Sequence, residues 1–366
     1  MRFVFKTDYN ADIRLHRHGA QLFWYGLLII FALSMPFLLD DFFLGEATSI
    51  LIWSIAGMGL MILTGHAGQA SLGHAAFLAV GCYANVILQT RYGLPFLVSF
   101  PLAGLIAGFA GVLVSIPFVR LHGIYLAIGT LALSVIIEDI IILAQPITGG
   151  VFGLSTPDIH LFGQRINRYA SPSLFYWLCL LVTIVVALGY ANLLRSSTGR
   201  SFLAIRDSEI SAKAMGVDVA RTKAVAFGLS SMVTGLAGAL LGHFAGAFNN
   251  ESFSILISIQ LLLMIVVGGL GSIHGAFFGA FVVSLIPQLI NIGRDALVTM
   301  TGRGGIAIPG LEVALFGLIL IGFLLLEPLG IYGRWLKIRT YLELFPFYRR
   351  DMFRRQRGYL KTERMR

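Results

Sequence analysis

The chain consists largely of apolar runs about 20 residues long, separated by short polar or glycine-rich turns. A helix of that length is what a chain needs to cross the hydrocarbon core of a bilayer. A membrane β-barrel would instead show strands of about ten residues in which apolar and polar positions alternate. The runs therefore predict an all-α, polytopic integral membrane protein.

Composition supports this class. Of the 366 residues, 57% are hydrophobic and 12% are charged, and the mean hydropathy is +0.83. A soluble domain carries about 25% charged residues, so this balance argues against a soluble enzyme or a nucleic-acid-binding domain. Cys82 and Cys179 lie within apolar runs and lack metal-ligand spacing, so we interpret both as packing residues.

About ten transmembrane or re-entrant helices are predicted, six before the longest charged loop and four after it. The predicted spans are 21–39, 46–63, 64–88, 94–119, 123–144 and 173–194, then 224–247, 253–267, 276–292 and 309–326. Both counts are even, so the N-terminus, the charged loop and the C-terminus are expected on one side. The expected organisation is a lead at 1–20, a permease-like membrane domain at 21–332 and a basic tail at 333–366.

Basic residues are concentrated in the three segments that this count places together. The lead, the loop at 195–223 and the tail hold 21 of the 27 Lys and Arg residues. Such residues favour the cytoplasmic side of a membrane, and the tail is also suited to anionic lipid headgroups. The lead is polar and has no small-residue cleavage site, so we expect no removable signal peptide.

The loop at 195–223 reads RSSTGRSFLAIRDSEISAKAMGVDVARTK, with six basic and three acidic residues. Thr198 is followed by helix formers, and Leu203, Ile205 and Ile210 are spaced among charged residues. This pattern predicts one or two short amphipathic helices. A cytoplasmic loop that folds in this way suggests a surface for contacting another protein.

The run at 64–88, TGHAGQASLGHAAFLAVGCYANVIL, differs from a lipid-facing helix. Glycines near its start lower helix propensity, and polar side chains at membrane depth usually face a cavity or another helix. We expect a span that is broken or unwound at its start and faces the protein interior. Its polar residues favour either a helix–helix hydrogen-bond cluster or part of a substrate path; they are Gln69, Ser71, His74 and Asn85.

Glycines four residues apart recur in several of the apolar runs. Close helix packing is the favoured interpretation, and a flexible hinge for gating is compatible with it. The glycines concerned are Gly104 and Gly108, then Gly238, Gly242 and Gly246, and then Gly271, Gly275 and Gly279.

Motifs for catalysis are missing from the sequence. No lysine follows a glycine, which excludes the Walker A pattern, and neither H-E-x-x-H nor G-x-S-x-G occurs. The eight histidines are scattered, so no zinc site, cofactor or enzymatic activity is predicted. Glu138 and Asp139 keep open a self-sufficient secondary transporter, since acids inside a membrane often mark ion pathways. The alternative is that both are solvated at the membrane surface.

Five stretches, in this order, resemble the LivM-type permease subunit of bacterial branched-chain amino acid ABC importers. They are GHAGQASLGHAAFLAVGCYA (65–84), TGGVFGL (148–154), GRSFLAIRDSEISAKAMGVD (199–218), KAVAFGLSSMVTGLAGAL (223–240) and GGLGSIHGAFFGA (268–280). The resemblance covers roughly 65–280 with apolar spans on both sides, and the basic stretch after 344 departs from the family pattern.

The resemblance implies a multi-pass subunit of the bacterial cytoplasmic (inner) membrane that forms half of a translocation path. Branched-chain or other hydrophobic amino acids are the expected substrates, with urea or short amides as the alternative. The expected partners are a second homologous permease subunit, two cytoplasmic ABC ATPase subunits, an extracytoplasmic substrate-binding protein and membrane lipids, with no nucleic acid.

The resemblance also implies a coupling segment at 199–216 that docks on an ATPase subunit. Glu209, Ala212 and Gly216 resemble the acidic–small–glycine pattern of such loops, with slightly different spacing. The residues expected there are Gly199, Arg200, Arg206, Asp207, Glu209, Ala212 and Gly216. The substrate path is expected to draw on Gln69, Ser71, His74, Asn85, Thr148 and Gly149 for the charged ends of its ligand.

Overall fold

The computed structural model describes residues 19–161, 163–301, 314, 317–318, 321–322 and 330–344. Up to the charged loop, the helices are α2 (Gly19–Leu38), α3 (Asp41–Leu60), the π-helix η1 (Met61–His66), α4 (His74–Thr90), α5 (Phe96–Phe118), α6 (Ile124–Leu143) and α8 (Pro172–Arg195). From the loop onward they are α9 (Ser197–Asp207), α10 (Glu209–Ala214), α11 (Val219–Ala245), α12 (Ile255–Gly268), α13 (Ile273–Thr301) and α15 (Gly330–Leu344).

Six of the described helices are long and apolar enough to cross a membrane: Asp41–His66, Phe96–Phe118, Ile124–Leu143, Pro172–Arg195, Val219–Ala245 and Asn250–Gly268. Shorter apolar helices are Phe23–Leu38, His74–Thr90 and Ile273–Gln288. The prediction of an all-α polytopic membrane protein is confirmed. The lead at 1–20, the span at 309–326 and the tail beyond 344 lie outside the described residues almost entirely.

The predicted break after the second span is confirmed. Helix α3 continues through η1 to His66, residues 67–73 are irregular, and α4 begins only at His74. Gly68 has a positive φ of 70°, a conformation that favours glycine. The Thr64 hydroxyl donates to the Gln69 carbonyl across the irregular segment at 3.1 Å. The α4 helix that follows is mostly buried, as its polar residues indicate.

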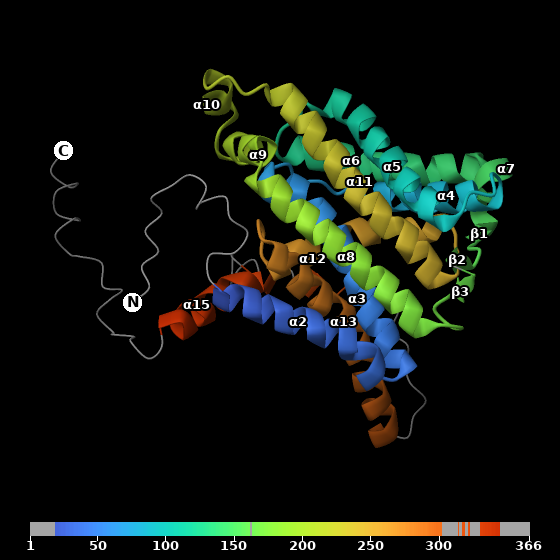
Figure 1. The fold of residues 1–366 in the computed structure, drawn as a ribbon. Coiled ribbons are helices and arrows are strands. Elements are labelled where there is room, and N and C mark those ends of the chain that lie inside the picture. Colours follow the sequence, from blue (N-terminus) through green and yellow to red (C-terminus); the bar gives the residue numbers. More distant parts are fainter. Residues whose placement is uncertain are drawn as a thin grey trace.

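Helix α11 is the central element and packs against α3, α4 and α5 (Figure 1). Its glycines allow close approach: a Cβ at Gly238 would lie 2.0 Å from the Leu78 carbonyl oxygen, and one at Gly242 would lie 2.5 Å from the Cys82 sulfur. Gly246 differs from these two, because it ends α11 with φ 80° in open space. The first two glycines of this series therefore serve helix packing and the third serves helix termination.

The two ends of the bundle differ. One end, here called the loop face, carries α9, α10 and the turns at 67–73, 119–123 and 269–272. The opposite end, the far face, carries α7 (Gln145–Thr148), the 3-10 turns η2 (Gly150–Phe152) and η3 (Asn250–Phe253), and the strands β1 (Leu154–Ser155), β2 (Ile159–Leu161), β3 (Gln164–Ile166) and β4 (Ala247–Phe248).

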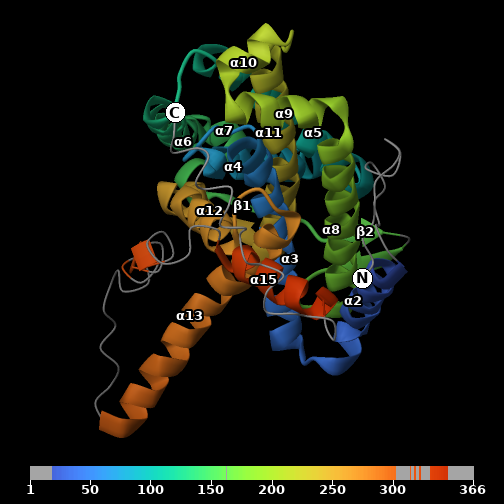
Figure 2. The same ribbon diagram turned by 90° about the vertical axis from the view of Figure 1, so that its left-hand side faces the viewer.

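The far-face strands tie distant segments together. Strands β1 and β4 pair antiparallel, with Leu154 opposite Phe248, and β2 pairs with β3. The long loop between α6 and α8 is thereby attached to the turn that follows α11. Near the other end of the chain, α15 contacts α12 and α13 and lies across them in Figure 2. Composition predicts only a basic tail from residue 333, whereas the structure continues as helix to Leu344.

Candidate functional site

The charged loop folds into two helices, each with a serine cap. The Ser196 hydroxyl accepts from the Gly199 amide to begin α9, and the Ser208 hydroxyl accepts from the Ser211 amide to begin α10, both at 3.2 Å. Such caps satisfy amides that have no partner within their helix. The prediction of one or two short amphipathic helices is confirmed.

The two helices bury one apolar face and present another. Phe202, Ile205 and Ala212 are 0–4% exposed and face the rest of the chain. Ile210 and Met215, in contrast, are each 85% exposed at the tip of the loop. Apolar side chains this exposed, on a folded polar loop, indicate a contact surface for another protein.

Glu209 has internal partners. Its Oε1 lies 2.7 Å from the Nζ of Lys223, which is only 2% exposed, and its Oε2 lies 3.0 Å from the Nε2 of His122. Lys223 also donates to the Val119 carbonyl at 3.3 Å. The structure therefore places Lys223 inside α11, which begins at Val219, rather than on the loop where the sequence pattern puts it. The cluster ties α10 to α11 and to the α5–α6 turn.

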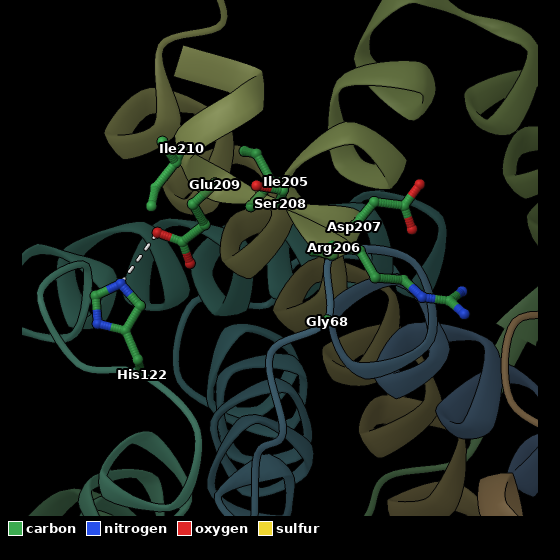
Figure 3. Close-up of a pocket in the computed structure, with 9 residues that line it drawn as sticks. Gly68, His122, Ile205, Arg206, Asp207, Ser208, Glu209 and Ile210 are labelled. Carbon is green, nitrogen blue, oxygen red and sulfur yellow. Dashed lines mark hydrogen bonds and ion pairs between the residues drawn. The ribbon is translucent and has the colours of Figure 1, made fainter. Parts of the chain in front are cut away.

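The environment of Glu209 keeps its carboxylate ionised. Burial alone would raise the pKa of Glu209, but hydrogen bonds from Lys223 and His122 outweigh it, so the pKa lies below its ordinary value. Beside the carboxylate, a cavity of about 470 Å³ opens between the α9–α10 junction, Gly68 and His122. Figure 3 shows Glu209 directed toward His122 at one wall of this cavity.

Arg206 points the other way. In Figure 3 its side chain and that of Glu209 extend to opposite sides of the α9–α10 junction. The Arg206 Nη1 donates to the Gly65 carbonyl at the end of η1, at 2.7 Å. The loop thus holds the bundle by two charged side chains from its central bend, one on each side.

The remaining loop residues singled out from the sequence have structural or surface positions. Gly199 is buried, and a Cβ there would lie 2.3 Å from the Leu193 carbonyl oxygen. Gly216 has φ 87° just after α10, where the chain reverses toward α11. Arg200 is exposed and donates to the Arg195 carbonyl at 3.0 Å. Asp207 is exposed on the cavity rim.

The polar residues at the start of α4 form a hydrogen-bonded cluster between helices. The His74 ring bonds to the Ser71 hydroxyl at 2.9 Å and to the Ser230 hydroxyl at 2.7 Å, and Ser230 donates to the Gly59 carbonyl. All three side chains are at most 1% exposed. The cluster joins α3, α4 and α11. This arrangement is the helix–helix hydrogen-bond cluster, one of the two interpretations that the sequence pattern favours. Gln69, nearby, is 5% exposed, and its Oε1 has no hydrogen-bond partner among the described residues.

The other expected path residues lie elsewhere. Asn85 is near the far end of α4, where it accepts from Ser99 and Gln89, and Gln89 in turn contacts His243 at 3.2 Å. Thr148 is buried at the far face and donates to the Ala144 carbonyl at 3.0 Å, closing the end of α6.

Thr148 and its neighbour Gly149, at φ 76°, therefore form a tight turn in the structure. The six residues occupy three places along the bundle and are not brought together. Sequence reasoning missed Ser230 and His243, although both are polar positions within the apolar run at 224–247.

Comparison with known proteins places these features in a family. The family model described as "Branched-chain amino acid transport system / permease component" matches residues 42–324. The high-affinity branched-chain amino acid transport system permease protein LivM of Escherichia coli (strain K12) is 33% identical over 296 residues, 75% of this chain and 70% of the relative.

More distant relatives match over similar lengths. A probable LivM of Methanocaldococcus jannaschii is 27% identical over 331 residues, 85% of this chain and 91% of the relative. An autoinducer 2 import system permease protein LsrC of Enterobacter sp. (strain 638) is 30% identical over 261 residues, 68% of this chain and 70% of the relative. No solved structure gives a significant match. The match over most of the chain, together with the membrane helices, shows that this protein belongs to the branched-chain amino acid transport permease family.

Proposed function

We propose that the chain is the permease subunit of an ATP-driven importer in a bacterial inner membrane. It forms half of a translocation path for branched-chain or other hydrophobic amino acids. A second homologous permease subunit forms the other half, two cytoplasmic ATPase subunits drive the cycle, and an extracytoplasmic binding protein delivers substrate. The relatives support this proposal through their printed roles in amino acid transport.

The observation that carries the proposal is the folded loop with its exposed apolar tip. Ile210 and Met215 stand out from the loop face at 85% exposure, while the sequence holds no Walker A motif. An ATP-driven transporter whose membrane chain lacks a nucleotide site needs a separate ATPase subunit, and an apolar tip among basic residues suits a groove on such a subunit. The basic residues that the sequence concentrates in the loop, the lead and the tail support a cytoplasmic position for this face.

The topology that we propose keeps ten helices in the membrane. The six long spans, the three shorter apolar helices and the segment at 309–326 make up the permease domain at 21–332, with the coupling loop at 195–223 inside it. The far face then meets the binding protein. The proposed lining of the path consists of Gln69, Ser71, His74, Asn85, Thr148 and Gly149. Substrate reaches this lining when the helices around His74 separate.

A self-sufficient secondary transporter is the second candidate, and it would need an acidic coupling site inside the bundle. Of its two candidate acids, both on α6, the least buried of the six long spans, Asp139 is exposed and Glu138 is half-buried. An exposed carboxylate on the rim of the bundle is poorly placed to bind an ion along a central path. The arrangement therefore favours the ATP-driven alternative.

The test substitutes the two apolar residues at the tip of the loop, because their side chains are exposed and contribute little to folding. We expect Ile210→Asp combined with Met215→Asp to abolish co-purification of ATPase subunits and uptake of radiolabelled leucine, without loss of folded protein. Phe152→Asp, a substitution at a 91%-exposed apolar residue of the far face, is the control and leaves ATPase binding unchanged. Normal ATPase binding and uptake in the double variant would refute the proposed docking surface.

A further inference from the structure

The Arg206 side chain contacts two separate turns of the loop face. Its Nη1 donates to the Gly65 carbonyl at 2.7 Å, on the turn between η1 and α4. A Cβ added to Gly68 would lie 3.1–3.3 Å from the Arg206 backbone and aliphatic stem. A Cβ added to Gly271, on the turn between α12 and α13, would lie 3.4 Å from Nη1.

At these two turns glycine is required for its backbone conformation as well as for its small size. Gly68 and Gly271 have φ values of 70° and 81°, a region that other residues rarely adopt. A Cβ at Gly65 would lie 2.9 Å from the Gly271 amide nitrogen, so the two turns also touch each other. The Arg206 side chain stays exposed to solvent, and the glycines of the GHAG and GGLG motifs let it lie close to both turns.

Charge favours the same contact. Gly65 lies at the C-terminal end of the continuous helix Asp41–His66. The last carbonyls of a helix lack intrahelical partners and carry partial negative charge, so a cation there is stabilised. The guanidinium supplies that cation with a rigid, planar set of donors.

The position of Arg206 in the chain connects these two turns to the proposed docking surface on α10. It is the second-last residue of α9, two residues before the bend at Ser208 from which α10 and its exposed Ile210 project. On the other side of that bend, Glu209 fixes α10 to Lys223 of α11. A displacement of the α9–α10 junction as a whole would therefore move Arg206 relative to the α3–α4 and α12–α13 turns.

We propose that Arg206 is a positioning residue that transmits movement of the coupling loop to the Gly-rich turns of α3–α4 and α12–α13. This inference rests on the proposed coupling function. Arg206 holds the two turns together in the arrangement seen here, and nucleotide-driven displacement of the loop releases them. Arg206 acts through its contacts with the two turns and does not itself contact the ATPase subunit or the substrate.

The test labels a cysteine placed in the irregular turn, Ala70→Cys, with a maleimide; the native Cys82 and Cys179 are buried. Arg206→Ala and Arg206→Lys are compared with Arg120→Ala, which removes an exposed arginine from the α5–α6 turn, outside the coupling segment. Labelling is measured in the lone chain, and then in the complex with ATPase subunits, both nucleotide-free and trapped with ATP and vanadate.

In the lone chain, we expect Arg206→Ala to label at least about fivefold faster than Arg120→Ala, the lower end of typical coupling between sites. In the complex, ATPase subunits stay bound, but the difference in labelling between the two nucleotide states disappears and uptake falls. Arg206→Lys keeps the charge and gives intermediate values, which guards against a variant that merely misfolds.

The inference is overturned if Arg206→Ala labels and transports like Arg120→Ala, or if it loses the ATPase subunits and so behaves as a docking residue. Failure of the parent chain to bind any ATPase subunit would refute the proposed function and, with it, the transmission. Labelling of the lone chain would still show whether Arg206 holds the turn that contains Ala70→Cys, so the two failures are distinguishable.

Discussion

The ion pair between Glu209 and Lys223 predicts a measurable loss of stability when one partner is removed. Glu209→Gln replaces the carboxylate 2.7 Å from the Lys223 ammonium, which is only 2% exposed, with a neutral amide, so the buried cation loses its counter-charge. Removing one partner of a fully buried pair costs about 3–5 kcal/mol, whereas exposed pairs contribute about 0–1 kcal/mol. Glu209 is 33% exposed, and Lys223 keeps the Val119 carbonyl as an acceptor. We therefore expect an intermediate loss of about 2 kcal/mol, roughly a 30-fold change in the unfolding constant.

The assay is unfolding by SDS in mixed detergent micelles at pH 7, followed by tryptophan fluorescence. Glu251→Gln is the matched control, since Glu251 is exposed at the far face. Lys223→Met removes the buried charge, so the double variant Glu209→Gln/Lys223→Met is expected to be more stable than Glu209→Gln alone. If Glu209→Gln unfolds like Glu251→Gln, or if the two single effects add within about 0.5 kcal/mol, the pair does not stabilise the loop.

Three further predictions concern Glu209, the close packing at Gly238 and the His74 cluster. Because the folded-state pKa of Glu209 lies below its ordinary 4.5, its contribution to stability is fully present above pH 4.5 and declines as the pH falls through the folded-state pKa; acid titration of wild type against Glu209→Gln measures the difference. Gly238→Ala forces a Cβ to within 2.0 Å of the Leu78 carbonyl oxygen and is expected to destabilise by about 1–3 kcal/mol, whereas Gly189→Ala, in open space on α8, is neutral or stabilising in the same unfolding assay. Ser230→Ala removes the hydroxyl that pairs with the His74 ring and is expected to destabilise by about 1–3 kcal/mol; a raised KM for uptake with unchanged stability would instead assign this cluster to the substrate path.

Local patterns allowed much of the fold to be predicted from the sequence. The glycines and polar residues from Gly65 to His74 correctly indicated a broken segment, because low helix propensity and hydrogen-bonding side chains act within a few residues. The two loop helices followed from their spacing of apolar residues. The start of α11 was placed too late, although Asp218 accepts from the Arg221 amide as an ordinary N-cap and offered a signal.

Contacts between distant residues could not be predicted in this way. Lys223 reads as a surface charge, and its burial depends on Glu209 folding back from α10. Arg206 and Gly65 are 141 residues apart, and no local pattern pairs them. The distant hydrogen-bond partner of His74 is Ser230, on a helix that the sequence pattern treats as ordinary apolar packing. Each of these pairings is set by how the helices pack, which a linear pattern does not record.

The measurement that tests the central claim most directly is purification of the chain from its native membrane in mild detergent, followed by an ATPase assay on the eluate. The account predicts a second hydrophobic permease and ATPase subunits in the eluate, with vanadate-sensitive hydrolysis that leucine-loaded binding protein accelerates. A lone chain without hydrolysis, reproduced across detergents, together with ion-dependent uptake in liposomes that contain only this chain, would contradict it and favour a secondary transporter.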